Sequence, residues 1–215
     1  TAQWMKMLRH TESEAQRLNM TVDMNMGTGW PFGGPEVTME DAAANAIFQE
    51  YLIKGGDSPT EKIMVADKKQ AGIARLSKLM AFSNDGIQRL DITACVAPDG
   101  AVNWIAPKDQ DWKIIALFDG RTLQKVKRAA PGGEGYVMDH FSKEATNRYF
   151  TKFDEAFAST NTHFPNSFFN DSYEVYGADW TPTFLDEFET RRGYRLQDYL
   201  PEFLQTCCVS LPAAC

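Results

Sequence analysis

The chain has 215 residues, of which 43% are hydrophobic and 24% are charged, and its formal net charge is −7. This composition is typical of a globular protein with enough apolar material for a sizeable core, and it disfavours disorder. The acidic balance without a cluster of Lys and Arg argues against a nucleic-acid partner, and no apolar run approaches the ~18 residues needed to cross a bilayer.

The N-terminal part of the chain predicts a helix, a strand, a loop and a second helix. Apolar residues fall at helical spacings in residues 4–18. "MTVDMNM" (20–26) is typical of a short buried strand, and the Gly- and Pro-rich "GTGWPFGGP" (27–35) of a tight loop. Helical spacing resumes in "TMEDAAANAIFQEYL" (38–52), where Thr38 can cap the helix. Such alternation indicates an α/β protein.

The middle of the chain predicts an antiparallel β unit. Its strand candidates, separated by turn-forming residues, are "IQRLDIT", "AVNWIAP", "DWKIIALF" and "RTLQKVKR". Only Asp119 and Gly120 link the last two candidates, and this residue pair favours the tight turn of a β-hairpin. We therefore expect the last two strands to pair with each other.

The α/β pattern returns in the C-terminal part of the chain. "YVMDHF" (136–141) predicts a strand, and Ser142 suits the N-cap of the helix that follows. The apolar face of that helix would consist of Ala145, Tyr149, Phe153 and Ala156. "NSFFNDSYE" (166–174) predicts the next strand, and Thr181 the cap of a further helix. Residues typical of the end of that helix are Arg191, Arg192 and Gly193.

Together these elements predict an α/β fold, part of a TIM-like (β/α)8 barrel with an inserted antiparallel β unit. We assign residues 1–61 to the first βα part of the barrel and 62–128 to the inserted β unit. Residues 129–203 would supply further βα units, and residues 204–215 form an atypical tail. Three of the four cysteines lie near the C-terminus, and their spacing matches no zinc site.

Three predicted strand ends carry side chains suited to chemistry, because catalytic groups of such barrels lie where strands end and βα loops begin. These ends carry Asp23 to Trp30, then Asp139 with His140, then Asp171 with Glu174. A carboxylate at the third end, walled by Tyr173, Tyr176 and Trp180, would be partly desolvated. Desolvation favours the protonated form that a general acid needs, and Glu174 fits this role best.

Simpler interpretations of these residues stay open. Glu174 could cap a turn or pair with an arginine, and Trp30 could pack on the core instead of lying flat against a sugar ring. The dispersed glycines around Trp30 match no phosphate-binding motif. Glu134 and Asp139 could supply oxygen ligands to a sugar or to a hard cation, or belong to an ordinary loop and strand.

Three segments, "MNMGTGWPFGGPEVTMEDA", "KRAAPGGEGYVMDHFSKEA" and "NDSYEVYGADWTPTFLDEFETRRGYRLQDYLP", together resemble the α-L-rhamnosidases of glycoside hydrolase family 106. The resemblance implies a (β/α)8 catalytic domain with inserted β structure. It also implies inverting hydrolysis of terminal α-L-rhamnose from polysaccharides or glycosides, and a calcium ion that helps to hold the sugar. We expect a periplasmic or secreted bacterial protein with a carbohydrate substrate and no membrane partner.

By the same resemblance, Glu174 is the candidate general acid, although its role could be exchanged with that of its partner carboxylate. The residues assigned to the substrate cleft are Asp23, Trp30, Asp139, His140, Asp171 and Trp180, and Glu134 is the candidate calcium ligand. Family members are far longer, so we expect the second catalytic carboxylate outside this chain and the chain alone to be inactive. The alternatives are another barrel glycosidase with a different sugar preference and a non-catalytic carbohydrate-binding or structural module.

Overall fold

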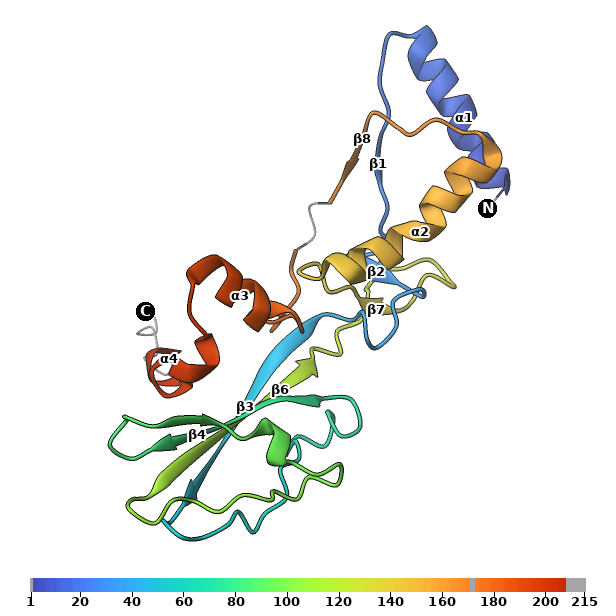
Figure 1. The fold of residues 1–215 in the computed structure, drawn as a ribbon. Helices are drawn as coiled ribbons and strands as arrows, with labels where there is room; N and C mark the ends of the chain where they lie inside the picture. Colours follow the sequence, from blue (N-terminus) through green and yellow to red (C-terminus); the bar gives the residue numbers. More distant parts are fainter. Residues whose placement is uncertain (1, 171–172, 208–215) are drawn as a thin grey trace, which may run out of the picture. The chain divides into compact units, whose positions relative to one another are not determined.

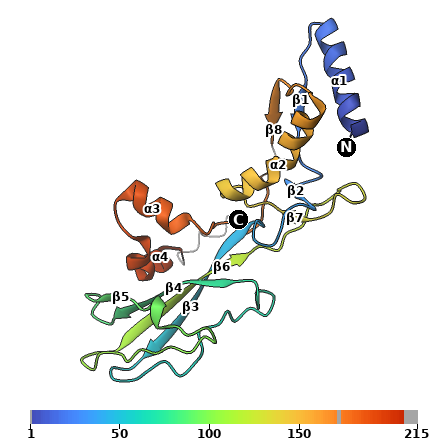
Figure 2. The ribbon, with the colours of Figure 1, turned by 45° about the vertical axis from the view of Figure 1, so that its right-hand side comes forward.

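The computed structural model describes residues 2–170 and 173–207, the last two by their backbone alone. The chain divides into two units, each described here by itself. The first unit contains the chain up to Ala43 and the segment Thr122–Ala178, and the second contains Ala44–Arg121 and the chain from Asp179 onward. Figures 1 and 2 show the elements of both units in colours that follow the sequence.

Two amphipathic helices form most of the first unit, as predicted. Helix α1 (Ala2–Arg17) buries Met5 and Leu8 in the same apolar cluster as Tyr149 of α2 (Lys143–Thr160). The predicted cap of α2 is confirmed, because the Ser142 hydroxyl accepts a hydrogen bond from the Ala145 N–H at 3.1 Å. Both helices therefore present one apolar face to a shared core.

The strands of the first unit form two small sheets. Strand β1 (Asp23–Asn25) pairs in parallel with β8 (Ser167–Phe169), and the two run side by side in Figures 1 and 2. Strand β2 (Gly33–Gly34) pairs in antiparallel fashion with β7 (Tyr136–Val137). A Cβ on Gly33 would lie 2.2 Å from the Tyr136 carbonyl oxygen, so only glycine permits this approach of the two backbones.

The second unit is built on a four-stranded antiparallel sheet in the order β3-β6-β4-β5. Its strands are β3 (Ala44–Ile53), β4 (Arg75–Ser83), β5 (Arg89–Asp91) and β6 (Trp112–Arg121). The short helix η1 (Thr93–Cys95) lies in the connection between β5 and β6. One face of the sheet packs Leu79, Ile114 and Ala116 into an apolar cluster. The opposite face packs Leu117 and Ile115 against the C-terminal helices.

The C-terminal helices are α3 (Phe184–Arg192), the short helix η2 (Leu196–Tyr199) and α4 (Leu200–Cys207). Helix α3 ends at Gly193, whose φ of 76° is the left-handed conformation predicted there. The predicted cap residue was wrong. The N-cap is Thr183, and the Thr181 hydroxyl is buried without a hydrogen-bond partner.

The helix predicted for residues 38–52 is wrong, because this segment enters strand β3. Ten residues of β3 pair with β6, and this tertiary pairing overrides the local helical spacing. Thr38 caps a turn and not a helix, since its hydroxyl accepts from the Asp41 N–H at 3.3 Å. Strand β4 had not been predicted, although it pairs with both β6 and β5.

The hairpin predicted at Asp119 and Gly120 is also wrong, because both residues lie inside β6. A Cβ on Gly120 would lie 2.5 Å from the Ile47 side chain of the neighbouring strand. This glycine therefore serves close packing and not a turn. The segment that was to pair with β6 instead forms isolated bridges in the first unit, and "AVNWIAP" contributes one isolated bridge at Val102.

The prediction of a mixed α/β fold is confirmed. The strands of the described residues form two two-stranded sheets and one four-stranded sheet, and no closed barrel is seen among them. None of the helices in this part of the chain is long and apolar enough to cross a membrane.

Candidate functional site

The Gly-rich loop that follows β1 (residues 27–35) is fastened at both ends by one tyrosine. The buried Tyr149 hydroxyl is shared between two carbonyl oxygens, at 2.9 Å from that of Met26 and 3.0 Å from that of Gly33. Burial raises the pKa of Tyr149 to about 12, and the negative charge of Glu36 adds to the shift. The phenol therefore stays protonated and keeps donating to the loop at neutral pH.

The same loop is bonded to the segment that precedes β7. The Trp30 N–H donates to the Lys127 carbonyl oxygen at 2.9 Å, and the Lys127 N–H donates back to the Trp30 carbonyl oxygen at 2.7 Å. The Thr28 hydroxyl donates to the Gly133 carbonyl oxygen at 2.7 Å. A Cβ on Gly29 would lie 2.6 Å from the Lys127 carbonyl oxygen, so glycine is required for this close approach. Two segments that are far apart in the sequence thus form one surface.

The segment that carries Glu174 is held to this surface by Gln124. The Gln124 amide donates to the Glu174 carbonyl oxygen at 3.1 Å and accepts from the Tyr176 N–H at 2.8 Å. The Lys127 ammonium lies 5.8 Å from the centre of the Trp30 ring and 6.0 Å from the centre of the Tyr176 ring. Trp30, Lys127 and Tyr176 are therefore neighbours, and the backbone of Glu174 is anchored beside them.

The predicted pair Asp139 and His140 lies at the end of β7, as expected. Asp139 is only 3% exposed, and its carboxylate accepts from the Phe141 N–H at 3.0 Å while its own N–H donates to the Asp41 carbonyl oxygen. The His140 ring lies 5.3 Å from the Tyr173 ring in an edge-to-face arrangement. The contact between His140 and Tyr173 brings the second predicted strand end close to the third.

The predicted desolvation of Glu174 is wrong for this chain. Its side chain is exposed, as are the rings of Tyr173 and Tyr176. Trp180 belongs to the core of the second unit, where it is 3% exposed and its ring N–H donates to Asp119 at 2.7 Å. Burial raises the pKa of Asp119, and the hydrogen bond from Trp180 opposes that shift. The buried indole of Trp180 has no face open to a sugar in this chain.

The prediction that Asp23 lies at a strand end is wrong, because Asp23 is the first residue of β1. Its carboxylate lies on the exposed face of the parallel pair β1 and β8. This carboxylate accepts from the Ser167 hydroxyl at 2.7 Å and from the Asn166 amide at 3.2 Å. These two hydrogen bonds, the one from Ser167 first, lower the pKa of Asp23. Asp23 is therefore an ionised acceptor at neutral pH. The predicted site residue Asp171 lies outside the described residues.

Glu134, the predicted cation ligand, lies in the exposed loop before β7. Its carboxylate accepts from the Gly132 N–H at 2.8 Å and so stabilises a local turn. In the part of the chain that the structure describes, no three His, Cys, Asp or Glu side chains gather as a metal site. These residues do not by themselves fit a calcium centre built from carboxylates, and the calcium ion stays a prediction.

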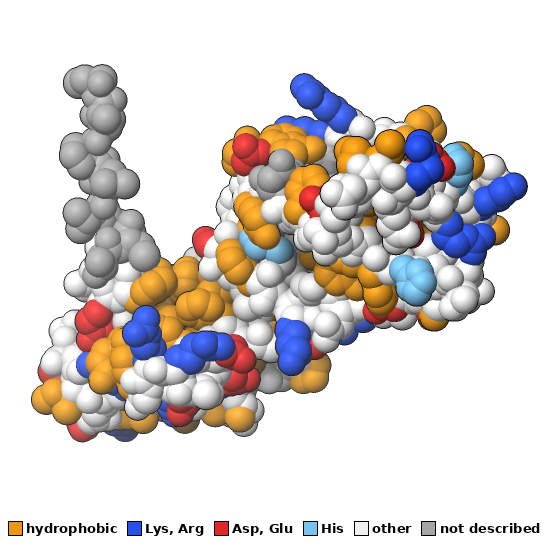
Figure 3. Space-filling view, turned by 90° about the horizontal axis from the view of Figure 1, so that it is seen from above, with side chains coloured by type: hydrophobic (Ala, Val, Ile, Leu, Met, Phe, Trp, Pro, Cys, Tyr) orange, Lys and Arg blue, Asp and Glu red, His pale blue; other side chains and the backbone are white. Residues whose placement is uncertain are grey.

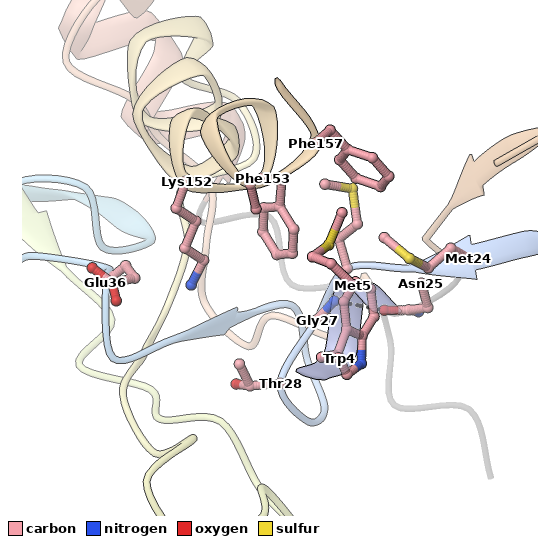
Figure 4. A pocket seen from close by; sticks show the side chains of 12 residues that line it. Trp4, Met5, Met24, Asn25, Gly27, Thr28, Glu36, Lys152, Phe153 and Phe157 are labelled. Atoms are coloured by element: carbon pink, nitrogen blue, oxygen red, sulfur yellow. Dashed lines mark hydrogen bonds between the residues drawn. The ribbon is translucent and has the colours of Figure 1, made fainter. Parts of the chain in front are cut away.

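A cavity of about 600 Å³ lies between the start of α1, the end of β1 and α2. Figure 4 shows Phe153 and Phe157 of α2 on one side, Trp4 and Met5 of α1 near them, and Lys152 and Glu36 toward the other side. Its walls are mostly apolar, and they contain none of the residues assigned to the cleft. The lining residues Met24 to Thr28 belong to the predicted strand end 23–30. Their contact with α1 and α2 depends on the tertiary fold and was not predicted.

Sequence reasoning missed the residues that organise the exposed surface. Tyr149 was placed correctly on the apolar face of a helix, but its hydroxyl contacts depend on the tertiary fold. Gln124 and Lys127 lie in a segment predicted as a strand, where polar residues carry no recognisable signal. Elsewhere on the face seen in Figure 3, Lys and Arg side chains occur at several separate places and do not form one basic patch.

Comparisons with known proteins relate the chain to glycoside hydrolases. The sequence model of glycoside hydrolase family 106, alpha-L-rhamnosidase, matches residues 66–214. A curated protein of Formosa agariphila, named "Putative beta-glucuronidase", is 27% identical over 242 aligned positions, which cover 92% of this chain and 20% of that protein. A solved rhamnosidase structure from Novosphingobium sp. PP1Y superposes with a TM-score of 0.73 at 15% identity, over 94% of this chain and 36% of the other. The chain thus spans about a fifth of the curated relative and about a third of the solved chain.

Proposed function

Because the chain belongs to glycoside hydrolase family 106, the alpha-L-rhamnosidases, we propose that it is part of the catalytic domain of an enzyme that hydrolyses terminal α-L-rhamnose. The substrate would be a polysaccharide or a glycoside. The family match over most of the chain is the observation that carries this proposal. The likeness to the Novosphingobium rhamnosidase supports the same fold.

In this proposal, Glu174 acts as the general acid of an inverting hydrolysis. It would give its proton to the glycosidic oxygen while a second carboxylate activates a water molecule on the opposite face of the sugar. Inverting enzymes hold the two carboxyl groups roughly 6.5–9.5 Å apart to leave room for this water. We expect the second carboxylate in a part of the longer protein that this chain does not contain.

The Glu174 side chain is exposed in this chain, so its surroundings here lack the apolar cover predicted for a general acid. A general acid must be protonated when it reacts, and a desolvated setting favours the protonated form of a carboxyl group. Gln124 bonds to the backbone of Glu174 and of Tyr176, and this fixes the point from which the Glu174 side chain extends. We propose that the bound sugar and the rest of the catalytic domain supply the missing desolvation.

The pair β1 and β8 favours a barrel in the longer protein. Met24 of β1 is buried on the side of the helices, whereas Asp23 lies on an exposed face. Parallel strands are normally covered on both faces. We propose that further βα units complete a (β/α)8 barrel around this face, and that the ionised Asp23 there accepts hydrogen bonds from sugar hydroxyls.

Hydrolysis of a glucuronide is the second candidate function. The Formosa agariphila protein that matches nearly the whole chain is named for that activity, and a uronide carries a carboxylate that a neighbouring lysine could bind. A non-catalytic carbohydrate module is the third candidate. Calcium binding and a periplasmic or extracellular location remain parts of the proposal.

The test is a substrate comparison with the longer protein that contains this chain. We expect turnover of p-nitrophenyl α-L-rhamnoside and little turnover of p-nitrophenyl β-D-glucuronide. Turnover of the glucuronide alone would favour the second candidate. Turnover of neither compound, with sugar binding retained, would favour the non-catalytic module.

A further inference from the structure

Lys127 is held in a defined place on the surface although its side chain is exposed. Its N–H and carbonyl group both bond to Trp30, and its neighbour Val126 is buried at 8% exposure. The ammonium group lies close to 6 Å from the centres of two aromatic rings, those of Trp30 and Tyr176. The anchored backbone thus places one cation near two rings.

No carboxylate neutralises this cation within the described ranges 2–170 and 173–207, since none of their ion pairs includes Lys127. A few other lysines are paired, for example Lys62 with Asp99 at 2.9 Å and Lys113 with Glu50 at 3.0 Å. Among the residues that the structure describes, the charge of Lys127 is therefore not shared with a carboxylate.

An ammonium group beside two aromatic rings favours a sugar that carries a negative charge. Aromatic faces pack against the apolar C–H face of a pyranose, as at many sugar sites. A neutral sugar over these rings would partly cover the ammonium without offering it a charge, and covering an unpaired charge is unfavourable. A pyranose that carries a carboxylate would instead give Lys127 a charge-assisted hydrogen bond.

We propose that Lys127, Trp30 and Tyr176 form a subsite for a uronic acid residue, so that the glycan bound here is acidic. This inference rests on the proposed function, because the subsite adjoins the candidate acid Glu174 through Gln124. It narrows the substrate class to glycans in which a hexuronate lies at or next to the cleaved bond.

The test measures binding, so that it does not depend on turnover. Methyl β-D-glucuronide and the neutral methyl β-D-glucuronamide have the same shape apart from the charged group, and each is titrated into the 215-residue chain by NMR. We expect the acidic sugar to bind about fivefold more tightly at low salt, the upper range for an exposed charge pair. High salt should reduce this preference, because salt screens exposed charges.

Variants assign the preference to Lys127. Lys127→Gln should bind both sugars equally, and Lys127→Arg should retain the preference because it keeps the charge. Lys125→Gln is the matched control, since the Lys125 ammonium lies on the same segment but 5.4 Å from the Tyr136 ring. Equal binding of both sugars by the natural chain, or a preference that survives in Lys127→Gln, would overturn the subsite.

The two proposals can fail separately. If the longer protein hydrolyses neither glycoside but the chain still prefers the acidic sugar through Lys127, the hydrolase proposal fails and the subsite stands. If rhamnoside is hydrolysed but the chain shows no preference for the acidic sugar, only the subsite fails.

Discussion

The carboxylate of Asp41, which is 6% exposed, is bound by the guanidinium group of Arg148. The Arg148 Nε atom donates to both carboxylate oxygens, at 2.9 Å and 3.1 Å, and the Nη2 atom makes a further contact. The Asp41 carbonyl oxygen accepts from the Asp139 N–H in turn. This pair therefore ties the turn before β3 both to α2 and to the end of β7.

Replacing Arg148 should destabilise the chain, because Asp41 would keep a buried charge without its partner. We expect Arg148→Met to lower the free energy of unfolding clearly more than its control does, because it removes charge-assisted hydrogen bonds to a buried carboxylate. Arg17→Met is the matched control, since Arg17 pairs with the exposed Glu14. This variant should change the free energy of unfolding by at most ~0.5 kcal/mol. Urea denaturation measures the stability of both variants. Equal losses in Arg148→Met and Arg17→Met would contradict a stabilising role for the pair of Asp41 and Arg148.

Tyr149→Phe should loosen the Gly-rich loop, because Met26 and Gly33 lose a shared donor. We expect a loss of about 1–2 kcal/mol in the free energy of unfolding. The pH dependence adds a sharper test. The folded pKa of Tyr149 is raised from 10.0 to about 12, so its contribution is complete below pH 10 and is lost as the pH rises toward 12. The difference in stability between the natural chain and Tyr149→Phe should therefore shrink from pH 9 to pH 12, and a constant difference would contradict the burial of a neutral phenol.

The lowered pKa of Asp23 should depend on Ser167. Hydrogen bonds to the charged form lower the pKa of a carboxyl group, so Ser167→Ala should move the pKa of Asp23 upward, toward its ordinary value. In the natural chain, the stabilising contribution of Asp23 should be complete above pH 3.8 and should decline as the pH falls through the lower folded pKa. Carbon-detected NMR titration of the Asp23 carboxyl group measures this directly. If the pKa of Asp23 is unchanged in Ser167→Ala, the hydrogen bond from Ser167 does not lower it.

Gly33→Ala should break the β2–β7 pairing, because the added Cβ would lie 2.2 Å from the Tyr136 carbonyl oxygen. We expect the free energy of unfolding to fall by about 2 kcal/mol or more, as it does when a tight contact is overpacked. Gly132→Ala serves as the control, since nothing lies within 4 Å of its Cβ position and only its φ of +85° opposes alanine. That variant should cost roughly 1 kcal/mol. The reverse order of stability would show that the backbones are less closely packed at Gly33.

Local signals predicted those elements whose ends are set by their own residues. Ser142 caps α2 and Gly193 ends α3, and each does so through contacts within a few residues. The signals failed where a distant strand decides the structure. Residues 44–53 have helical spacing, but their backbone pairs with β6. Gly120 has the residue type of a turn, yet it is glycine because Ile47 occupies the space of its Cβ.

The candidate site was predictable in its segments but not in its contacts. The strand end at Asp139 was identified from the strand pattern before it, whereas Asp23 proved to be the first residue of its strand. The bonds from Gln124 to the backbone of Glu174 and Tyr176 could not be foreseen, because a glutamine in an extended segment has many possible partners. The exposure of Glu174 depends on which other segments cover it, and local sequence holds no information on that.

The most direct test of the central claim is the dependence of Glu174→Gln on the leaving group. A general acid matters most for a poor leaving group, so the variant of the longer protein should hydrolyse an alkyl α-L-rhamnoside at least ~100-fold more slowly. The rate on p-nitrophenyl α-L-rhamnoside should fall far less, because its phenolate leaves without protonation. The control variant Glu155→Gln should hydrolyse both substrates as fast as the natural protein does. Equal losses of Glu174→Gln on the two substrates, or no loss on either, would contradict the assignment of Glu174 as the acid.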